Sequence, residues 1–320
     1  MPIVDEFETH RIHLLSVAYR LTGSVADAED AVQESWLRLA GADTDAITNL
    51  RAWLTTVVSR LCLDHLRSAA VRRESYVGQW LPEPVAVSLT GTPPPEPLDA
   101  VVRSEDARMA AMVVLDALGP DQRVAFVLHD GFGVPFGDIA GVLGTSVAGS
   151  RQLASRARRA VTAAAAPPRD TDHDQAVGRV VAAIASGDLQ AVVDALHPDV
   201  RLIGDAGGTT RTAVNVIVGP EKVARFHLGL AARYGELMMR SSEPALVNGE
   251  LGLISGGSPG DATHPGFPAR VAGFTVRDGK VWAVYDFANP AKLTGVRAGA
   301  TLPPRPAPSP PPTEPGRSPY

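Results

Sequence analysis

Apolar residues in the first half of the chain recur at intervals of three and four positions, which is the spacing of one face of an α-helix. In VADAEDAVQESWLRLA, residues 25–40, the apolar stripe consists of Ala28, Val32, Trp36 and Leu39. A second stripe at the same spacing consists of Asp27, Asp30, Glu34 and Arg38. Ser24 precedes both stripes, where a serine side chain can cap the first turn. The pattern predicts an amphipathic helix with an acidic exposed face.

The next stretch with helical spacing covers residues 50–74 and leaves several arginines on its polar side. The loop before it, AGADTDAITN, breaks the helical pattern. A polar loop beside Trp53 and several arginines suits an extruded base and its backbone, because aromatic rings stack on bases and arginines bind phosphates. An ordinary loop with Trp53 in the core fits the composition equally well, so both interpretations stay open at this point.

A helix-turn-helix pattern lies at residues 136–161, FGDIAGVLGTSVAGSRQLASRARRAV. We expect the first helix to end at Gly144, a short turn to follow, and a basic helix to come next. Bases are read by side chains near the start of the second helix, and cations on the same helix neutralise phosphates. Candidates of both kinds are Ser146, Ser150, Arg151, Gln152, Arg156 and Arg158. A solvated basic helix at the end of a bundle is the alternative.

The last part of the chain combines helical spacing with strand-like runs. Helical periodicity in residues 175–196 and 221–234 gives way to runs such as VRLIGD, ARVAGFTV and VWAVYDF. Asp278 and Gly279 form the usual two-residue turn of a hairpin. Helices followed by a meandering antiparallel sheet predict an α+β unit. A curved sheet wrapped by such helices normally encloses an apolar pocket.

Proline-rich stretches divide the chain into units. We expect a first all-α unit at residues 1–78, a linker at 79–104 and a second all-α unit at 105–166. The α+β unit is expected at 172–292, followed by a proline-rich tail at 293–320. Such a tail is predicted to be disordered or polyproline-like. The predicted fold class is therefore multidomain, with two all-α units followed by an α+β unit.

The composition excludes several classes of protein. At 45% hydrophobic and 20% charged residues, with a net charge of −5, the chain is typical of a soluble protein and not of a generally basic nucleic-acid binder. No stretch approaches the roughly 20 apolar residues of a membrane span, and the N-terminus lacks the pattern of a signal peptide. The lone Cys62 excludes an intramolecular disulfide. We expect a cytoplasmic protein without membrane contact.

Titratable residues in the α+β unit raise the alternative of an acid-base pair in its pocket. These residues are His197, Asp199, Asp205, His227 and Asp286. Their spacing matches neither an HExxH metal motif nor a facial triad, and the chain has no G-x-S-x-G nucleophile elbow. We therefore expect no catalytic residues, no metal, no cofactor and no enzymatic activity.

The order of the motifs resembles that of a known family. The stretches HRIHLLSVAYRLTGSVADAEDAVQESWLRL, NLRAWLTTVVSRLCLDHLRS and LDALGPDQRVAFVLHDGFGVPFGDIAGVLGTSVAGSRQLASRARR resemble, in this order, the two helical domains of extracytoplasmic-function (ECF) sigma factors. The resemblance covers residues 1 to about 166. It implies a first domain that binds the clamp helices of core RNA polymerase and opens the −10 promoter element. The second domain would read the −35 element with its helix-turn-helix.

The resemblance also implies roles for individual residues. The polymerase-binding helix would use Asp27, Asp30, Gln33, Glu34, Trp36 and Arg38. The −10 element would be contacted by Asn49, Arg51, Trp53, Arg60, Asp64, Arg67 and Ser68. The −35 element would be contacted by the helix-turn-helix candidates named above. The acidic stripe thereby becomes a candidate interface, because the polymerase surface that it would meet is basic.

Residues 172 to about 290 resemble a SnoaL-like domain of the NTF2-like superfamily. YVGQWLPEP and NPAKL resemble signatures of the ECF41 or SigJ-like group, whose members carry this extra domain in place of a separate anti-sigma factor. In that group the domain is thought to modulate the sigma domains in cis. The group usually has a DGGGK-like stretch, whereas this chain has DAGGT at residues 205–209, without the lysine. The departure concerns the role of that loop and not the fold.

The stretch WLPEP is predicted to dock the linker onto the α+β unit. Its prolines stiffen the chain, and its tryptophan and leucine need an apolar cover. The candidate docking residues are Trp80, Leu81, Pro82, Glu83 and Pro84 in the linker, and Asn289, Pro290, Lys292 and Leu293 at the end of the α+β unit. Packing of WLPEP on its own helical neighbour is the alternative.

Together these features predict an alternative sigma factor that brings core RNA polymerase to promoter DNA and is regulated in cis by its third unit. Two other functions stay open: a SnoaL-like cyclase or isomerase fused to a DNA-binding module, and a ligand-sensing regulator that binds DNA without polymerase. The expected partners are core RNA polymerase and promoter DNA, with an unidentified small ligand in the pocket as an open case.

Overall fold

The computed structural model describes residues 3–73, 76, 78–90, 96–164, 166–208 and 212–297. The predicted tail beyond residue 297 and Thr209 of the DAGGT stretch lie outside the described residues. The first helical region comprises α1 (Ile3–Thr22), α2 (Val25–Ala40), the short η1 (Thr44–Ala46) and α3 (Leu50–Arg73). The predicted cap of α2 is confirmed, because the Ser24 hydroxyl accepts a hydrogen bond from the backbone N–H of Asp27 at 3.2 Å.

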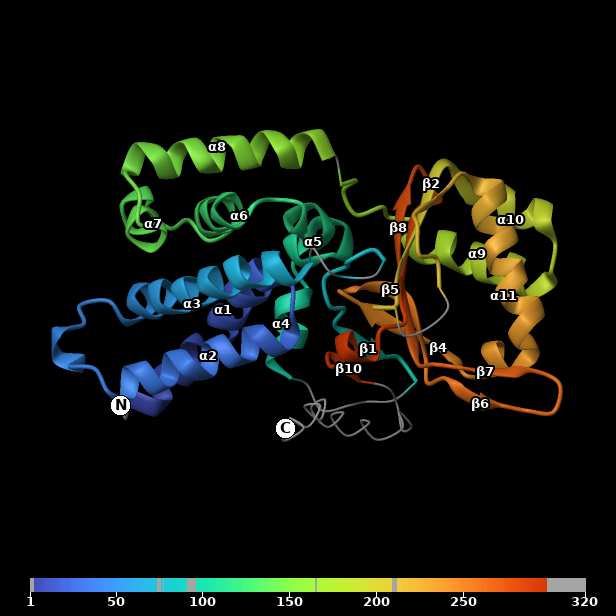
Figure 1. Cartoon of the computed structure of the whole chain (residues 1–320), viewed down its shortest axis with the longest axis horizontal. Helices are drawn as coiled ribbons and strands as arrows, with labels where there is room; N and C mark the ends of the chain where they lie inside the picture. The colour runs from blue at the N-terminus through green and yellow to red at the C-terminus, as the bar shows by residue number, and fades with distance from the viewer. Residues whose placement is uncertain are drawn as a thin grey trace, which may run out of the picture.

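A second helical region follows the linker. Its elements are α4 (Pro97–Val102), η2 (Glu105–Ala107), α5 (Met109–Asp116), α6 (Pro120–Phe126), η3 (Val127–Gly131), α7 (Phe136–Leu143) and α8 (Val147–Ala164). Helix α7 ends at Gly144 in the left-handed conformation (φ 66°), as the sequence predicts, and α8 begins after a short turn. The buried side chains of both helical regions form one continuous core, and α3 lies along α6 and α7 (Figure 1).

The third unit is built on an eight-stranded sheet with strand order β10-β1-β4-β5-β8-β9-β2-β3. Its strands are β2 (Leu196–Asp205), β3 (Ile217–Val218), β4 (Ser242–Val247), β5 (Glu250–Ser255), β8 (Arg270–Arg277), β9 (Lys280–Phe287) and β10 (Val296–Arg297). Its helices are α9 (His173–Ser186), α10 (Leu189–Ala195), α11 (Pro220–Arg240) and the short η4 (Pro290–Lys292). A separate two-stranded sheet consists of β6 (Ser258–Gly260) and β7 (Pro265–Phe267). The predicted hairpin turn at Asp278 and Gly279 is confirmed between β8 and β9.

Two features of the sheet differ from the predicted antiparallel meander. Strands β2 and β9 pair in parallel, so the sheet is mixed. The eighth strand is β1 (Ala86–Ser88), which comes from the linker and pairs with β4 on one side and β10 on the other. The linker is therefore built into the third unit's sheet, because the backbone N–H and C=O groups of a buried extended segment need partners.

The two faces of this sheet are covered by different parts of the chain. Side chains of β9 alternate: Val284 joins the core beneath α9 and α11, whereas Tyr285 and Phe287 point to the opposite face. That opposite face forms a second core with Leu81 of the linker and Met109 of α5. Figure 1 shows α5 beside β8, with helices α9–α11 on the far side of the sheet. The sigma-like half of the chain thus completes the core of the third unit.

Candidate functional site

The acidic face of α2 is accessible to solvent. Asp30 and Gln33 are exposed, Glu34 pairs with exposed Arg38 at 3.1 Å, and Asp27 is 2.9 Å from His65 of α3. Trp36, from the same helix, is half-buried and lies against Phe7 with ring centroids 5.1 Å apart. The five polar side chains form a surface that a basic partner can reach, with Trp36 at its edge.

The candidate −10 residues lie along α3. Asn49 caps this helix, because its side-chain oxygen accepts from the backbone N–H of Ala52 at 3.0 Å. Arg51 contacts His13 at 3.1 Å, and burial together with this arginine lowers the pKa of His13 to about 4. Trp53 is half-buried against the helical core. Asp64 and Ser68 are exposed on the following turns.

Two arginines of α3 bind the second helical region. The Arg60 guanidinium donates to the backbone carbonyl of Gly141 in α7 at 3.0 Å. Arg67 donates to the carboxylate of Asp121 in α6 at 3.0 Å. The face of α3 that carries these two predicted promoter-binding arginines therefore lies against α6 and α7.

The outer face of α8 is open. Ser146, Arg151, Gln152 and Arg156 are exposed, and Arg158 makes a bidentate ion pair with Asp130 at 2.8 and 3.0 Å. Ser150 corrects the sequence prediction, because its side chain is fully buried and donates to the carbonyl oxygen of Phe136 at 3.2 Å. Ser150 therefore joins α7 to α8 and does not face DNA.

The WLPEP stretch contacts the third unit at a buried ion pair of that unit. Lys292 and Asp205 lie 2.6 Å apart with side chains 4% and 0% exposed. The same carboxylate accepts from the backbone N–H of Leu81 at 2.8 Å, and Lys292 donates to the Leu81 carbonyl. The Lys292 ammonium also lies 3.3 Å from the ring centroid of Trp80. We call Tyr76, Trp80, Leu81, Asp205 and Lys292 the linker cluster.

Tyr76 closes this cluster from the other side. Its hydroxyl donates to Asp205 and accepts from the Asn289 amide at 2.9 Å. Burial lowers the pKa of Lys292 to about 8, against the opposing attraction of Asp205. Asn289 also caps η4 through the N–H of Ala291, whereas Pro290 is exposed and Leu293 half-buried. Four of the nine predicted docking residues, Trp80, Leu81, Asn289 and Lys292, thus meet around Asp205.

The remaining docking residues join the linker to the first helical region. Glu83, flanked by buried Pro82 and Pro84, accepts with its side chain from the N–H of Val25 at 2.7 Å, at the first turn of α2. Its carbonyl accepts from the Tyr19 hydroxyl at 2.7 Å. Desolvation raises the pKa of Glu83, and the bond from Val25 opposes that shift. WLPEP therefore contacts both the third unit and α1–α2.

Sequence reasoning missed Asn248, which lies where three parts of the chain meet. It is fully buried in the turn between β4 and β5, with a positive φ of 49°. Its amide donates to the Tyr19 hydroxyl at 2.8 Å and to the Ala107 carbonyl at 2.7 Å, and its oxygen accepts from the Val85 N–H at 3.0 Å. The Asn-Gly dipeptide signals such a turn, but nothing local indicates what the side chain binds.

A neighbouring ion pair on the same turn was missed as well. Glu250 lies 3.5 Å from Arg108, and both side chains are buried. Arg108 also donates to the carbonyl of Pro167 at 2.9 Å, just before the third unit begins. The turn between β4 and β5 therefore contacts the first helical region, the linker and the start of the second helical region.

The titratable residues predicted in the third unit do not form one group. His227 and Asp286 line the same cavity, whereas Asp205 belongs to the linker cluster. His197 lies 4.0 Å from Asp278, and Asp199 is exposed. Of the five titratable residues predicted for the pocket, His227 and Asp286 line it in the structure.

Comparison with known proteins identifies the two helical regions. Residues 7–72 match the Sigma-70 region 2 family, and residues 108–161 match the Sigma-70, region 4 family. Over 295 residues the chain is 59% identical to the ECF RNA polymerase sigma factor SigJ of Mycobacterium tuberculosis, covering 91% of this chain and 93% of the relative. The chain belongs to the ECF RNA polymerase sigma factors. As a sigma factor it acts in the initiation of transcription.

Further comparisons extend the similarity over the third unit. The sigma factor is 32% identical over 306 residues to the probable ECF sigma factor SigI of the same organism, covering 93% of this chain and 97% of the relative. It superposes on the crystal structure of M. tuberculosis SigJ with a TM-score of 0.80 and 57% identity, covering 92% and 99% of the two chains. Among the residues that the structure describes, no helix of the sigma factor is long and apolar enough to span a membrane.

Proposed function

We propose that the third unit regulates this sigma factor in cis by holding region 2 and region 4 in a closed arrangement that cannot engage both promoter elements. The observation that carries the proposal is the pairing of Arg60 and Arg67 with region 4, at Gly141 and Asp121. Side chains cannot bind region 4 and the −10 element at once. Opening of this interface is therefore required before the −10 element is bound.

The acidic face of α2 is the proposed polymerase-binding surface. Asp27, Asp30, Gln33, Glu34 and Arg38 are all accessible at least in part, and a surface of this charge complements the basic clamp helices. The linker side chain that binds the first turn of α2, Glu83, connects this surface to WLPEP. A movement of α2 on polymerase binding would therefore also displace the linker through this hydrogen bond.

The two DNA-binding surfaces are proposed at α3 and α8. Asn49, Arg51, Trp53, Arg60, Asp64, Arg67 and Ser68 would contact the −10 element, and Ser146, Arg151, Gln152, Arg156 and Arg158 would contact the −35 element. The α8 residues are exposed in the closed arrangement, whereas two α3 arginines are engaged. The closed protein would accordingly retain weak −35 contacts and lack −10 contacts.

The linker cluster and Asn248 are the proposed regulatory contacts. A domain regulates only if it interacts differently with the two states. Both contacts join the third unit to segments that connect region 2 with region 4, namely residues 76–85 and 107–108. Separation of the two regions would stretch these segments and break buried polar contacts, so the third unit favours the closed state.

A reconstituted transcription assay tests this function. The full-length sigma factor, core RNA polymerase and a library of candidate promoters are combined, with another sigma factor as positive control. We expect initiation at a defined promoter class, and co-elution with core polymerase in gel filtration at low salt. Failure of both the full-length chain and its Lys292→Met variant to start transcription at any promoter would contradict the proposal. Truncation after residue 168 is a poor test, because it would expose Leu81 and Met109 of the shared core.

A further inference from the structure

The third unit contains a cavity of about 480 Å³ between the sheet and helices α9 and α11. Its volume is in the range of cavities that hold drug-sized ligands. Four of its 21 lining residues, His227, Ser242, Arg270 and Asp286, are polar. The others are aliphatic, aromatic or methionine side chains, proline or glycine. A cavity with this lining favours an apolar ligand, because a polar ligand would lose its hydrogen bonds to water without replacing them.

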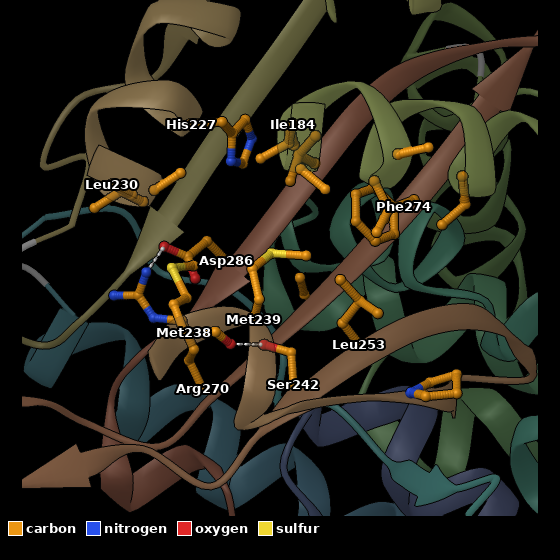
Figure 2. Close-up of a pocket in the computed structure, with 18 of the residues that line it drawn as sticks. Ile184, His227, Leu230, Met238, Met239, Ser242, Leu253, Arg270, Phe274 and Asp286 are labelled. Carbon is orange, nitrogen blue, oxygen red and sulfur yellow. Dashed lines mark hydrogen bonds and ion pairs between the residues drawn. The ribbon is translucent and has the colours of Figure 1, made fainter. Parts of the chain in front are cut away.

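Three of the four polar residues lie on one side of the cavity. Figure 2 shows His227, Asp286 and Arg270 on that side, with Phe274 and Leu253 across from them, and Ser242 beside Met239. Arg270 and Asp286 form an ion pair at 3.5 Å with side chains 6% and 7% exposed, so their charges offset each other. Thr212 donates a second bond to Asp286 at 2.6 Å. This side of the cavity therefore offers polar atoms without a net charge.

His227 provides the second independent observation. Its Nε2 atom is buried and has no hydrogen-bond partner among the described residues. Burial lowers the pKa of His227 to about 4, so the ring is neutral at pH 7. A neutral imidazole can donate or accept at Nε2, according to its tautomer. A buried polar atom without a partner is costly, and a ligand hydroxyl or carbonyl in the cavity would remove that cost.

We propose that this cavity binds an uncharged, largely apolar small molecule that carries one hydroxyl or carbonyl group, and that this group hydrogen-bonds His227 Nε2 beside the Arg270–Asp286 pair. An anionic ligand is disfavoured, because Arg270 is already neutralised and a second carboxylate would approach Asp286. A cationic ligand would face the Arg270 guanidinium in an apolar enclosure.

The cavity is connected to the linker cluster through β9 and β2. Asp286 pairs with Gly204 in the sheet register, one residue before Asp205 of the linker cluster. The backbone N–H groups of Ala288 and Asn289 then bind the Asp205 carbonyl at 2.8 and 3.1 Å. A ligand bound to His227 packs against Asp286 in the same cavity, and this contact restrains the strand ends that hold Asp205. This coupling, which rests on the proposed function, would make occupancy of the cavity strengthen docking of the linker.

Three probes of one skeleton test the site in the full-length protein: 2-naphthol, naphthalene and 2-naphthoate, each titrated by intrinsic fluorescence and calorimetry. We expect saturable binding of 2-naphthol, two- to tenfold weaker binding of naphthalene, which lacks one hydrogen bond, and still weaker binding of 2-naphthoate. His227→Phe should abolish the preference for 2-naphthol over naphthalene, whereas His197→Phe, outside the cavity, should retain it. Ala231→Phe, which fills the cavity, should weaken all three probes.

Tighter binding of 2-naphthoate, equal binding of all three probes to the wild-type protein, or no saturable binding would each overturn the site. These three outcomes are measured on the wild-type protein, so they do not depend on whether any variant folds. The coupling is read from hydrogen exchange of residues 79–85, which 2-naphthol should slow. Unchanged hydrogen exchange of this segment in the presence of 2-naphthol would overturn only the coupling between the cavity and the linker cluster. Failure of the proposed function is detected separately, by the Lys292→Met variant without any ligand.

Discussion

Lys292→Met removes the ammonium from the linker cluster and keeps a side chain of similar length. In the wild-type protein this ammonium binds Asp205 at 2.6 Å, donates to the Leu81 carbonyl and lies over Trp80 at 3.3 Å. The methionine fills much of the same volume but leaves the Asp205 carboxylate buried with Tyr76 and the Leu81 N–H as its remaining donors.

The expected cost follows from the burial of this pair. Removing one partner of a buried ion pair costs about 3–5 kcal/mol, because the other charge stays buried without compensation. Both partners lie in the third unit, and the linker covers them through the Leu81 N–H and carbonyl. Because the Asp205 carboxylate left by the substitution regains water when the linker leaves, this cost weakens docking of the linker. At about 1.4 kcal/mol per factor of ten, the docked state should lose roughly 100- to 5,000-fold in population relative to the undocked state.

Hydrogen exchange of the segment at residues 79–85 measures this change. The Leu81 N–H is bonded to Asp205 at 2.8 Å, so it exchanges only when the linker leaves the third unit, whereas the Glu83 N–H is bonded to the Gly23 carbonyl of the first helical region at 2.7 Å. Lys280→Met is the matched control, because it removes the same charge from an exposed position on the third unit. Equal exchange of this segment in Lys292→Met and Lys280→Met would refute the reasoning.

Three further predictions concern other contacts of the closed state. Asp121→Asn removes the partner of Arg67, an exposed pair worth about 0.2–1 kcal/mol, so binding of −10 DNA should rise up to about fivefold in a fluorescence anisotropy titration; Glu221→Gln, within α11, should leave it unchanged. Asn248→Ala leaves buried groups unpaired at about 1–3 kcal/mol each and should lower the melting temperature far more than Gln190→Ala, at an exposed site; equal losses would contradict the role of Asn248. The pKa of His227 is lower in the folded protein (about 4) than its ordinary 6.5, so the unfolded state binds more protons between these values. Its stabilising contribution is present above pH 6.5 and lost as the pH falls toward 4. The melting temperature of the wild type should therefore fall more steeply than that of His227→Phe between pH 7 and 4.5. Parallel plots of melting temperature against pH would show that His227 is not a source of the pH dependence.

Much of the local structure could be predicted from the sequence, because local rules decide it. Apolar spacing and the serine cap predicted α2 at residues 25–40, where the structure has Val25–Ala40. Gly144 and the Asp278–Gly279 turn were predicted from the backbone conformations that these residues favour. The motif order also predicted the sigma regions that the comparisons confirm.

Contacts between distant segments could not be predicted in the same way. Strand β1 lies in a proline-rich stretch, and its partners β4 and β10 are far along the chain, so no local pattern indicates it. Ser150 occupies a position where helix-turn-helix proteins read DNA, but it faces α7. The convergence of His227 and Asp286 depends on how α11 packs against β9, which the periodicity of either element does not show.

The distance between region 2 and region 4 in solution tests the central claim most directly. Spin labels at exposed Ala52 of α3 and Ala160 of α8, introduced as cysteines in a Cys62→Ser background, report this distance by double electron-electron resonance. We predict one distance for the free full-length protein and a longer one when core RNA polymerase and promoter DNA are bound, with Lys292→Met shifting the free protein toward the longer distance. The same distance in both states, or a longer distance in the free protein than in the complex, would contradict the account.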